Sequence, residues 1–373
     1  MRPRPDTAGF QSFVGVDLHK CTVTLVAVNP AGDEVAQLTI STKSVEKIEH
    51  WIKQLPRPCW LAVEACPFVE WFIERYRSCV DRIDIADATE LSNLRGKRRK
   101  NDRNDARDIA QRLARGECPL GFIADVPLMQ LRKLGRHWRQ LSRLISRTKH
   151  AMKSLLHAAN LNGPKFDSAG AQRWLLAHGH LLGPVQRQMF ADYVDTISLV
   201  ERQREKLRRD ILMAPRDKKF VETQLILQST PGIGDIWSLM IAAEIGPFDR
   251  FPNSDTIEFW AGLTADMKSS AGRTQSGPIT KAGSVTLRWA LCQAACTLCM
   301  SDPRQEKIRQ RYIRRLGKAR ANVAMGRRLL GTLFAMIRDQ KPYRREQKSN
   351  RAAAANAAKA QRKAKQPSRK PAA

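Results

Sequence analysis

Short apolar runs separated by polar turns occupy the first part of the chain, residues 10–125. Runs of this length, divided by turn residues, are typical of strands. The segments predicted as strands are Phe13–Asp17, Val23–Val28, Glu34–Ser41, Cys59–Glu64 and Arg82–Ala86. Ser44–Leu55 and Phe68–Tyr76 place apolar residues at helical spacing. This order predicts an α/β domain whose first three strands form an antiparallel meander.

The apolar period changes over residues 126–215. From Leu131 to Ala159, apolar residues recur at steps of three and four, which predicts the seam of a coiled coil. A second long helix is predicted over Val185–Met213, with Arg204 interrupting its seam. Cations on the other faces of the first helix have few acids to balance them. We therefore favour a dimerising arm that clamps RNA over the alternative, a solvated helical hairpin.

Residues 216–340 are predicted to be mostly helical. Glu222–Gln228 and Ile236–Ile245 flank Thr230–Gly234, an arrangement typical of a helix–hairpin–helix. Gly232 and Gly234 allow a phosphate to approach the backbone, and the helix that follows adds the positive end of its dipole. The alternative is a tight turn that only packs two helices together.

A polar segment and a basic tail follow. Composition predicts a flexible surface loop over Lys268–Gly277 and a helix over Val285–Met300. Residues 341–373 are rich in alanine and cations and cannot build a core. We expect this tail to be disordered when free and to anchor the chain on DNA or RNA.

The charge of the chain narrows the class of partner. A formal net charge of +29 repels itself unless a polyanion offsets it. Nucleic acid is the leading partner, and an anionic membrane is the weaker alternative. We find no apolar run of transmembrane length and no signal-peptide core, so a cytoplasmic, nucleoid-associated bacterial protein is expected.

The eight cysteines do not form a pattern of disulfide or metal ligands. Cys292, Cys296 and Cys299 fall at helical spacing, and no partner pair stands at the spacing of a zinc site. They are predicted to pack as small apolar residues on a buried helix.

Acidic residues lie at the ends of predicted strands, where α/β sheets usually carry their functional residues. Asp17 and Glu64 end the first and fourth strands, and neighbouring strands would bring them to one edge. Asp102 and Asp105 share one face if their segment is helical, although a solvated helix face is the alternative. Four converging carboxylates repel one another, which predicts one or two Mg²⁺ ions between them. His19 stands two residues after Asp17, and a local structural role is favoured for it over an approach to the metal site.

Three of these segments resemble a known family. Val14–Asp17, Val63–Ala65 and Asn101–Ala106 resemble the Asp-Glu-Asp-Asp set of the RuvC-like, RNase H-type domain of bridge-RNA-guided insertion-sequence transposases, relatives of the Piv DNA invertases. The resemblance implies an RNase H-like mixed sheet whose four acids bind Mg²⁺. It also implies a structured guide RNA that pairs with target and donor double-stranded DNA. Dimers would form through the coiled coil and pair into tetramers.

The C-terminal part is similar to the transposase domain of the same family. Ala261–Thr264, the segment Ser269–Gly272 and Lys281–Gly283 carry this similarity. That domain supplies a serine nucleophile just ahead of a glycine, and Ser270 occupies the matching place. Ser269 is the second candidate, and Ser276 is the third.

Together these features predict a DNA transposase that cuts and rejoins DNA through a covalent serine–DNA intermediate. The alternatives are a metal-only RuvC-like nuclease or junction resolvase, and a non-catalytic nucleic-acid-binding protein. Eight residues are predicted to contact nucleic acid: Lys97, Arg98, Arg99, Lys100, Arg103, Gly232, Gly234 and Lys281.

Overall fold

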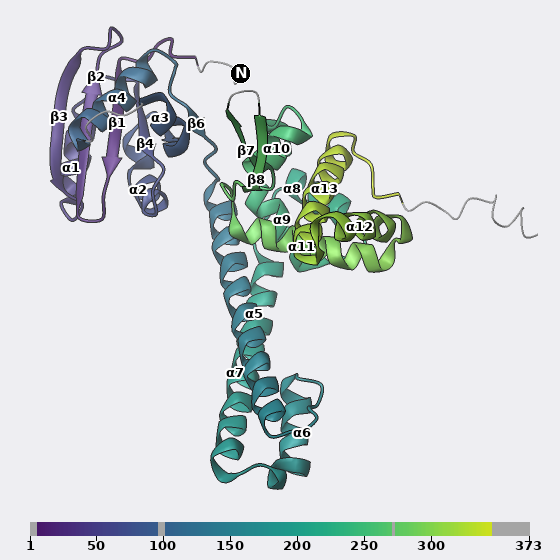
Figure 1. The fold of residues 1–373 in the computed structure, drawn as a ribbon. Coiled ribbons are helices and arrows are strands. Elements are labelled where there is room, and N and C mark those ends of the chain that lie inside the picture. The colour runs from purple at the N-terminus through teal and green to yellow at the C-terminus, as the bar shows by residue number, and fades with distance from the viewer. Residues whose placement is uncertain (1–5, 96–100, 271–272, 345–373) are drawn as a thin grey trace, which may run out of the picture. The chain divides into compact units, whose positions relative to one another are not determined.

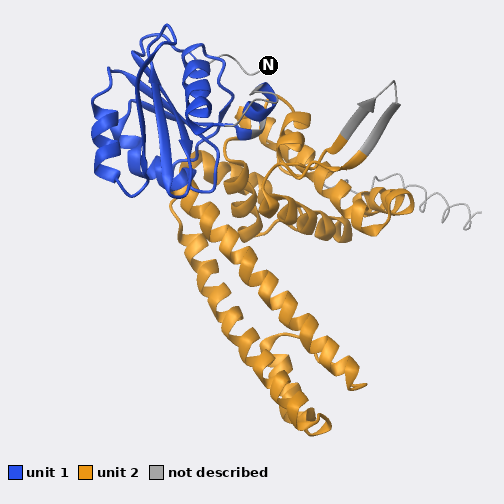
Figure 2. Cartoon of the chain, turned by 60° about the vertical axis from the view of Figure 1, so that its left-hand side comes forward, with its two compact units in different colours: residues 1–126 blue, residues 127–373 orange. Residues whose placement is uncertain are grey.

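The computed structural model describes residues 6–95, 101–270 and 273–344. The chain divides into two compact units, residues 1–126 and 127–373 (Figure 2). Each unit has its own hydrophobic clusters and is described by itself below.

A mixed six-stranded sheet forms the centre of the first unit (Figure 1). The strands are β1 (Ser12–Leu18), β2 (Thr22–Val28), β3 (Glu34–Ser41), β4 (Cys59–Glu64), β5 (Arg82–Ala86) and β6 (Leu120–Gly121), in the order β3-β2-β1-β4-β5-β6. The first three strands form an antiparallel meander. The pairs β1–β4 and β4–β5 are parallel, and the short β6 runs antiparallel to β5. The predicted α/β order and RNase H-like mixed sheet are confirmed.

Helices cover both faces of this sheet. On one face, α1 (Val45–Lys53) and α2 (Val69–Tyr76) pack against the strands. On the other face lie α3 (Ala88–Arg95) and α4 (Asp102–Ala114). Because both faces are covered, β1 is buried along its whole length, and its sequence is an apolar run from Phe13 to Val16. The edge strand β3 instead alternates partly buried and exposed residues.

Gly15 allows α4 to lie directly on β1. A Cβ atom at this position would stand 2.0 Å from the carbonyl oxygen of Ala106 and 2.6 Å from the backbone nitrogen of Ala110. Both atoms belong to the backbone of α4, so the clash cannot be relieved by turning a side chain. The helix is therefore held in contact with the strand that carries Asp17.

This contact predicts a large loss of stability in the Gly15→Ala variant. We expect the free energy of unfolding to fall by about 3 kcal/mol or more, because the added methyl group displaces a backbone rather than a side chain. Urea unfolding followed by circular dichroism measures the change. Gly121→Ala is the matched control, since its Cβ would meet the carbonyl oxygen of Ile85 at an ordinary 3.5 Å. Equal midpoints for the two variants would contradict this packing.

Two long helices begin the second unit. Helix α5 (Val126–Ala158) and α7 (Pro184–Met213) run side by side, joined through α6 (Ser168–His178) (Figures 1 and 2). Apolar residues from both long helices share two clusters along their length. The predicted seam thus packs within the chain. Arg204, which interrupts it, places its guanidinium 5.7 Å from the ring centre of Trp138.

The rest of the unit is a helical bundle with one hairpin. Its helices are α8 (Lys218–Gln228), α9 (Asp235–Ile245), α10 (Ser254–Trp260), α11 (Val285–Ser301), α12 (Pro303–Leu316) and α13 (Lys318–Arg338). They enclose the largest apolar cluster. Burial raises the pKa of the Cys292 and Cys299 thiols to about 11, which fits their packing as small apolar groups.

Two details differ from the sequence prediction. The prediction of a flexible loop over Lys268–Gly277 is wrong, because β7 (Ala265–Ser270) and β8 (Arg273–Ile279) form an antiparallel hairpin. At the start of the basic tail, the Tyr343 hydroxyl donates to Asp302 Oδ2 at 2.7 Å, so this part of the tail is fixed to α12. Residues 345–373 of the tail lie outside the described residues. In the described part of the chain, every helix is too short or too polar to cross a lipid bilayer.

Candidate active site

The ends of β1 and β4 bring two acids to one edge of the sheet. The two strands are parallel, with Val16 opposite Val63. Asp17 and Glu64 each follow directly after this pair, so they leave neighbouring strands at the same level. Asp17 is buried, with 8% of its surface exposed, whereas Glu64 is partly exposed. The sheet register therefore accounts for half of the predicted acid set.

The first turn of α4 supplies the other two acids. The Asn101 side chain caps this helix by accepting a hydrogen bond from the backbone nitrogen of Arg103 at 3.1 Å. Asp102 and Asp105 lie in the first helical turn, where the positive end of the helix dipole stabilises negative charge. Contact of α4 with Gly15 then holds this turn close to the end of β1.

Arg103, predicted to contact nucleic acid, has a partner within the chain. Its Nη2 donates to Glu34 Oε1 at 2.9 Å, and Arg107 Nε donates to Glu34 Oε2 at 2.6 Å. Burial alone would raise the pKa of Glu34, but these two arginines outweigh it and lower the pKa. The two arginines thus join α4 to Glu34 on the edge strand β3, and these bonds fix the orientation of the helix.

His19 lies between two of the acids, contrary to the local structural role assigned to it. Its Nε2 stands 3.4 Å from Asp17 Oδ2 and 3.6 Å from Asp102 Oδ1. One ligand atom from each of these three residues lies within 4.8 Å of the others. The signal in the sequence was the spacing of Asp17 and His19. Asp17 lies in β1 and His19 directly follows its last residue, and alternate residues of an extended chain share a face.

Burial and neighbouring negative charges dominate the electrostatics of Asp17. Its Oδ2 is buried and accepts no hydrogen bond from the described residues, although His19 Nε2 stands 3.4 Å away. Burial raises the pKa of this carboxyl, His19 opposes the rise, and the negative charges of Asp102, Glu64 and Asp105 add to it. The other three predicted acids thus all lie close enough to raise the pKa of the Asp17 carboxyl group.

The donor set fits a hard divalent cation. Carboxylate oxygens are the ligands that Mg²⁺ prefers, and a cation beside Asp17 Oδ2 would give that buried oxygen its missing partner. Asp17 and Asp102 each offer an oxygen ligand and His19 offers a nitrogen, and these three atoms lie within 4.8 Å of one another. Glu64 and Asp105 are near enough to affect the charge of Asp17.

The candidate serines lie on the β7–β8 hairpin of the second unit. Ser270 is the last residue of β7 and pairs with Arg273, the first residue of β8. Ser269 pairs with Thr274, and Ser276 pairs with Met267 further along the hairpin. Ser270 is therefore nearest to the tip, at the end of a paired strand rather than within a loop.

Gly232 and Gly234, the two glycines of the predicted helix–hairpin–helix between α8 and α9, differ in their surroundings. Gly232 has a φ of +92°, and a Cβ there would stand 2.7 Å from Thr297 Cβ. Helix α11 thus covers Gly232, which indicates close packing rather than an open phosphate site. Gly234 has open space around its missing Cβ and caps α9.

The remaining predicted nucleic-acid contacts have different outcomes. Lys281 is exposed and has a φ of +58°, a strained value for a residue with a side chain. The basic run Lys97, Arg98, Arg99 and Lys100 lies outside the described residues.

Some cations of α5 have partners that the sequence did not reveal. Arg136 binds the buried Glu244 through two hydrogen bonds of 2.9 and 3.1 Å. Arg132 Nε donates to the Ala243 carbonyl at 2.7 Å. Both arginines thus bind the last turn of α9, where cations are favoured by the helix dipole. The inference that the α5 cations lack acidic partners is wrong for Arg136.

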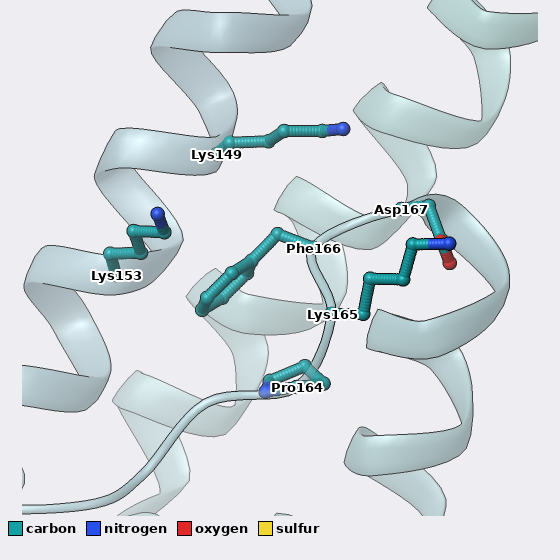
Figure 3. Close-up of a pocket in the computed structure, with 6 residues that line it drawn as sticks. All are labelled: Lys149, Lys153, Pro164, Lys165, Phe166 and Asp167. Atoms are coloured by element: carbon teal, nitrogen blue, oxygen red, sulfur yellow. The ribbon is translucent and has the colours of Figure 1, made fainter. Parts of the chain in front are cut away.

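A pocket of about 430 Å³ lies between α5 and the loop before α6 (Figure 3). Its cations have partners within the chain: Lys165 pairs with Asp167 at 3.2 Å, and Lys149 approaches Glu201 at 3.9 Å. Lys153 Nζ stands 5.4 Å from the ring centre of Phe166. The three lysines that line the pocket are thus held by contacts within the chain.

Fold and acids together define the class. A mixed sheet with an antiparallel meander, acids at the ends of two parallel strands and further acids on the following helix are features of the RNase H-like class. Residues 14–160 match the DEDD transposases of the IS110 type, and residues 224–312 match the family described as transposase IS116/IS110/IS902. The chain belongs to this IS110/IS116/IS902 family of transposases.

One similar relative carries a name of the same kind. It is the transposase for insertion sequence element IS1111A of Coxiella burnetii (strain RSA 493 / Nine Mile phase I), which is 27% identical over 122 residues. The match covers 32% of this chain and 34% of the relative, so it spans about a third of each protein.

Proposed function

We propose that this protein is a DNA transposase that excises and inserts an insertion sequence. The observation that carries the proposal is the buried Asp17 Oδ2, which accepts no hydrogen bond from the described residues and is surrounded by the charges of three more acids. Such a site needs a cation, and the chain belongs to a family of transposases with this acid set.

The acids would hold one or two Mg²⁺ ions. Asp17, Glu64, Asp102 and Asp105 are the proposed ligands, with His19 beside the first and third. Bound Mg²⁺ would stabilise negative charge that develops on phosphodiester oxygens. The contact at Gly15 and the Glu34 ion pairs keep α4 in place, so the acids are positioned before the substrate binds.

Ser270 is the proposed nucleophile. Its Oγ would attack the phosphorus of a DNA phosphodiester, forming one P–O bond to serine while one P–O bond to a sugar breaks. The serine proton would pass to the leaving sugar oxygen, which departs as a hydroxyl group. The reverse attack, by a sugar hydroxyl of another strand, would rejoin the DNA and release the serine.

A structured guide RNA and an oligomer are further parts of the proposal. The net charge of +29 favours polyanionic partners, and exposed cations of α5 such as Arg143 and Arg147 support an RNA-binding arm. Guide pairing with target and donor DNA, and dimers that pair into tetramers, follow from the family resemblance.

The test is a search for a covalent protein–DNA product with the purified chain, its candidate RNA and labelled donor DNA. With Mg²⁺, we expect a product that resists denaturation by detergent, and with EDTA we expect none. Mg²⁺-dependent cutting without a covalent product would instead support a metal-only nuclease. DNA binding with no cutting in either condition would support a non-catalytic protein.

A further inference from the structure

Helix α12 has two faces of different character. Ile308 and Tyr312 pack against the large apolar cluster of the second unit, beside α11 and α13 (Figure 1). Lys307, Arg311 and Arg314 follow one another at steps of four and three residues, so they lie on the opposite, outer face. The helix is thus fixed by its apolar face and presents a row of cations on the other.

The row extends past the end of the helix. We name as the α12 cationic stripe six exposed residues: Lys307, Arg311, Arg314, Arg315, Lys318 and Arg320. Within the described residues, none of these six forms an ion pair or a hydrogen bond through its side chain. The nearby acid Glu306 is engaged instead by Arg309 at 3.3 Å.

This arrangement is unfavourable for the isolated protein. Like charges at i,i+3 and i,i+4 repel one another and destabilise a helix. Helices whose charges serve only solubility usually mix the two signs. A polyanion that lies along the stripe would turn this repulsion into attraction.

We propose that the α12 cationic stripe binds the phosphate backbone of duplex DNA. The segment from Lys307 to Arg315 spans about 12 Å at 1.5 Å per residue, which matches roughly three to four nucleotide steps of one strand. Contacts to phosphates alone make the binding independent of sequence. The inference rests on the proposed function, which supplies DNA as the substrate, and adds the surface that would hold it.

The composition of the stripe favours a duplex over a single strand. Proteins that hold single strands stack bases on aromatic side chains. The aromatic residue of α12, Tyr312, packs toward the core, and the Arg315 guanidinium stands 5.8 Å from its ring centre. The outer face thus offers charge without a stacking platform.

The salt dependence of binding tests the proposal. The test variant combines Lys307→Gln, Arg311→Gln and Arg314→Gln in the full chain. Fluorescence anisotropy with a labelled DNA duplex gives Kd over a range of NaCl concentrations. Removing three phosphate contacts should lower the slope of log Kd against log salt by about 2–3 and weaken binding at least ~10-fold at 0.1 M salt.

A second triple variant controls for the loss of net charge. It combines Lys43→Gln, Lys47→Gln and Arg77→Gln, which remove exposed cations of the first unit. We expect its slope to fall by less than about 1. Equal effects of the two triples would overturn the proposal, since net charge alone would then explain them.

Two other polyanions serve as further comparisons. The triple variant of Lys307, Arg311 and Arg314 is also tested on an RNA duplex and on phosphatidylserine vesicles. If it lost binding to either of these but bound DNA as the wild type does, the assignment to DNA would be overturned. Failure of the proposed function gives a different result: the wild-type chain would bind DNA through the stripe yet form no covalent product.

Discussion

Replacing Ser270 with alanine should abolish both the covalent protein–DNA product and strand exchange. The variant lacks the oxygen that would attack phosphorus, and loss of a nucleophile in a comparable covalent mechanism lowers the rate by at least ~10³-fold. Binding of DNA and Mg²⁺ should change little, because Ser270 lies on the hairpin of the second unit and the acids lie in the first. Gel detection of the detergent-resistant product measures the effect.

Two neighbouring serines provide matched controls for this experiment. Ser269→Ala and Ser276→Ala remove the same hydroxyl group from the same hairpin. Both variants should keep the covalent product. If Ser270→Ala formed the product at the wild-type rate and Ser269→Ala did not, the nucleophile would be Ser269. Normal recombination by all three variants would contradict the covalent serine mechanism.

Replacing Asp17 with asparagine should lower activity as strongly as Ser270→Ala does. In the absence of Mg²⁺, the same replacement should raise the stability of the fold. Loss of a metal ligand should lower Mg²⁺-dependent strand cutting by roughly 10³-fold or more. In the absence of Mg²⁺, however, the variant should melt at a higher temperature than the wild type. Asparagine removes a buried negative charge that three nearby acids repel.

Thermal melting with and without Mg²⁺ separates these two effects. Mg²⁺ should raise the Tm of the wild type and leave the Tm of Asp17→Asn unchanged. Asp33→Asn is the control, because Asp33 lies in the turn between β2 and β3, where it bonds with Asn29. A rise of Tm with Mg²⁺ in Asp17→Asn equal to that of the wild type would contradict the site.

The pH dependence of melting follows from the raised pKa of Asp17. Without Mg²⁺, a raised folded-state pKa favours the fold at low pH, and this contribution is lost as the pH rises through that pKa. Cation binding needs the ionised carboxylate, so the rise of Tm with Mg²⁺ should vanish on acidification. It should vanish at a higher pH than an aspartate with the ordinary pKa of 3.8 would give.

The sequence was most informative where burial is simplest. Strands β3, β4 and β5 were predicted with the observed bounds. Strand β4 is buried on both faces and reads as an apolar run, whereas β3 alternates as an edge strand does. The neighbouring positions of Asp17 and Glu64 followed from the expected pairing of the strands that carry them.

Features that depend on distant partners were not visible in the sequence. The pairing of Arg136 with Glu244 joins residues 108 positions apart. The β7–β8 hairpin consists largely of polar residues, so its backbone pairing left no apolar alternation to detect. The position of His19 between the acids was not predicted, because its approach to Asp102 requires α4 to lie on β1.

The position of α4 on the sheet bears on how the site tolerates changes elsewhere in the chain. Gly15 and Glu34 hold this helix through contacts with β1 and β3. The distance between Asp17 and Asp102 is therefore set by packing, and not by the length of the chain that joins β4 to α4. A change in the length of that chain that leaves these contacts intact would therefore keep the acids in register.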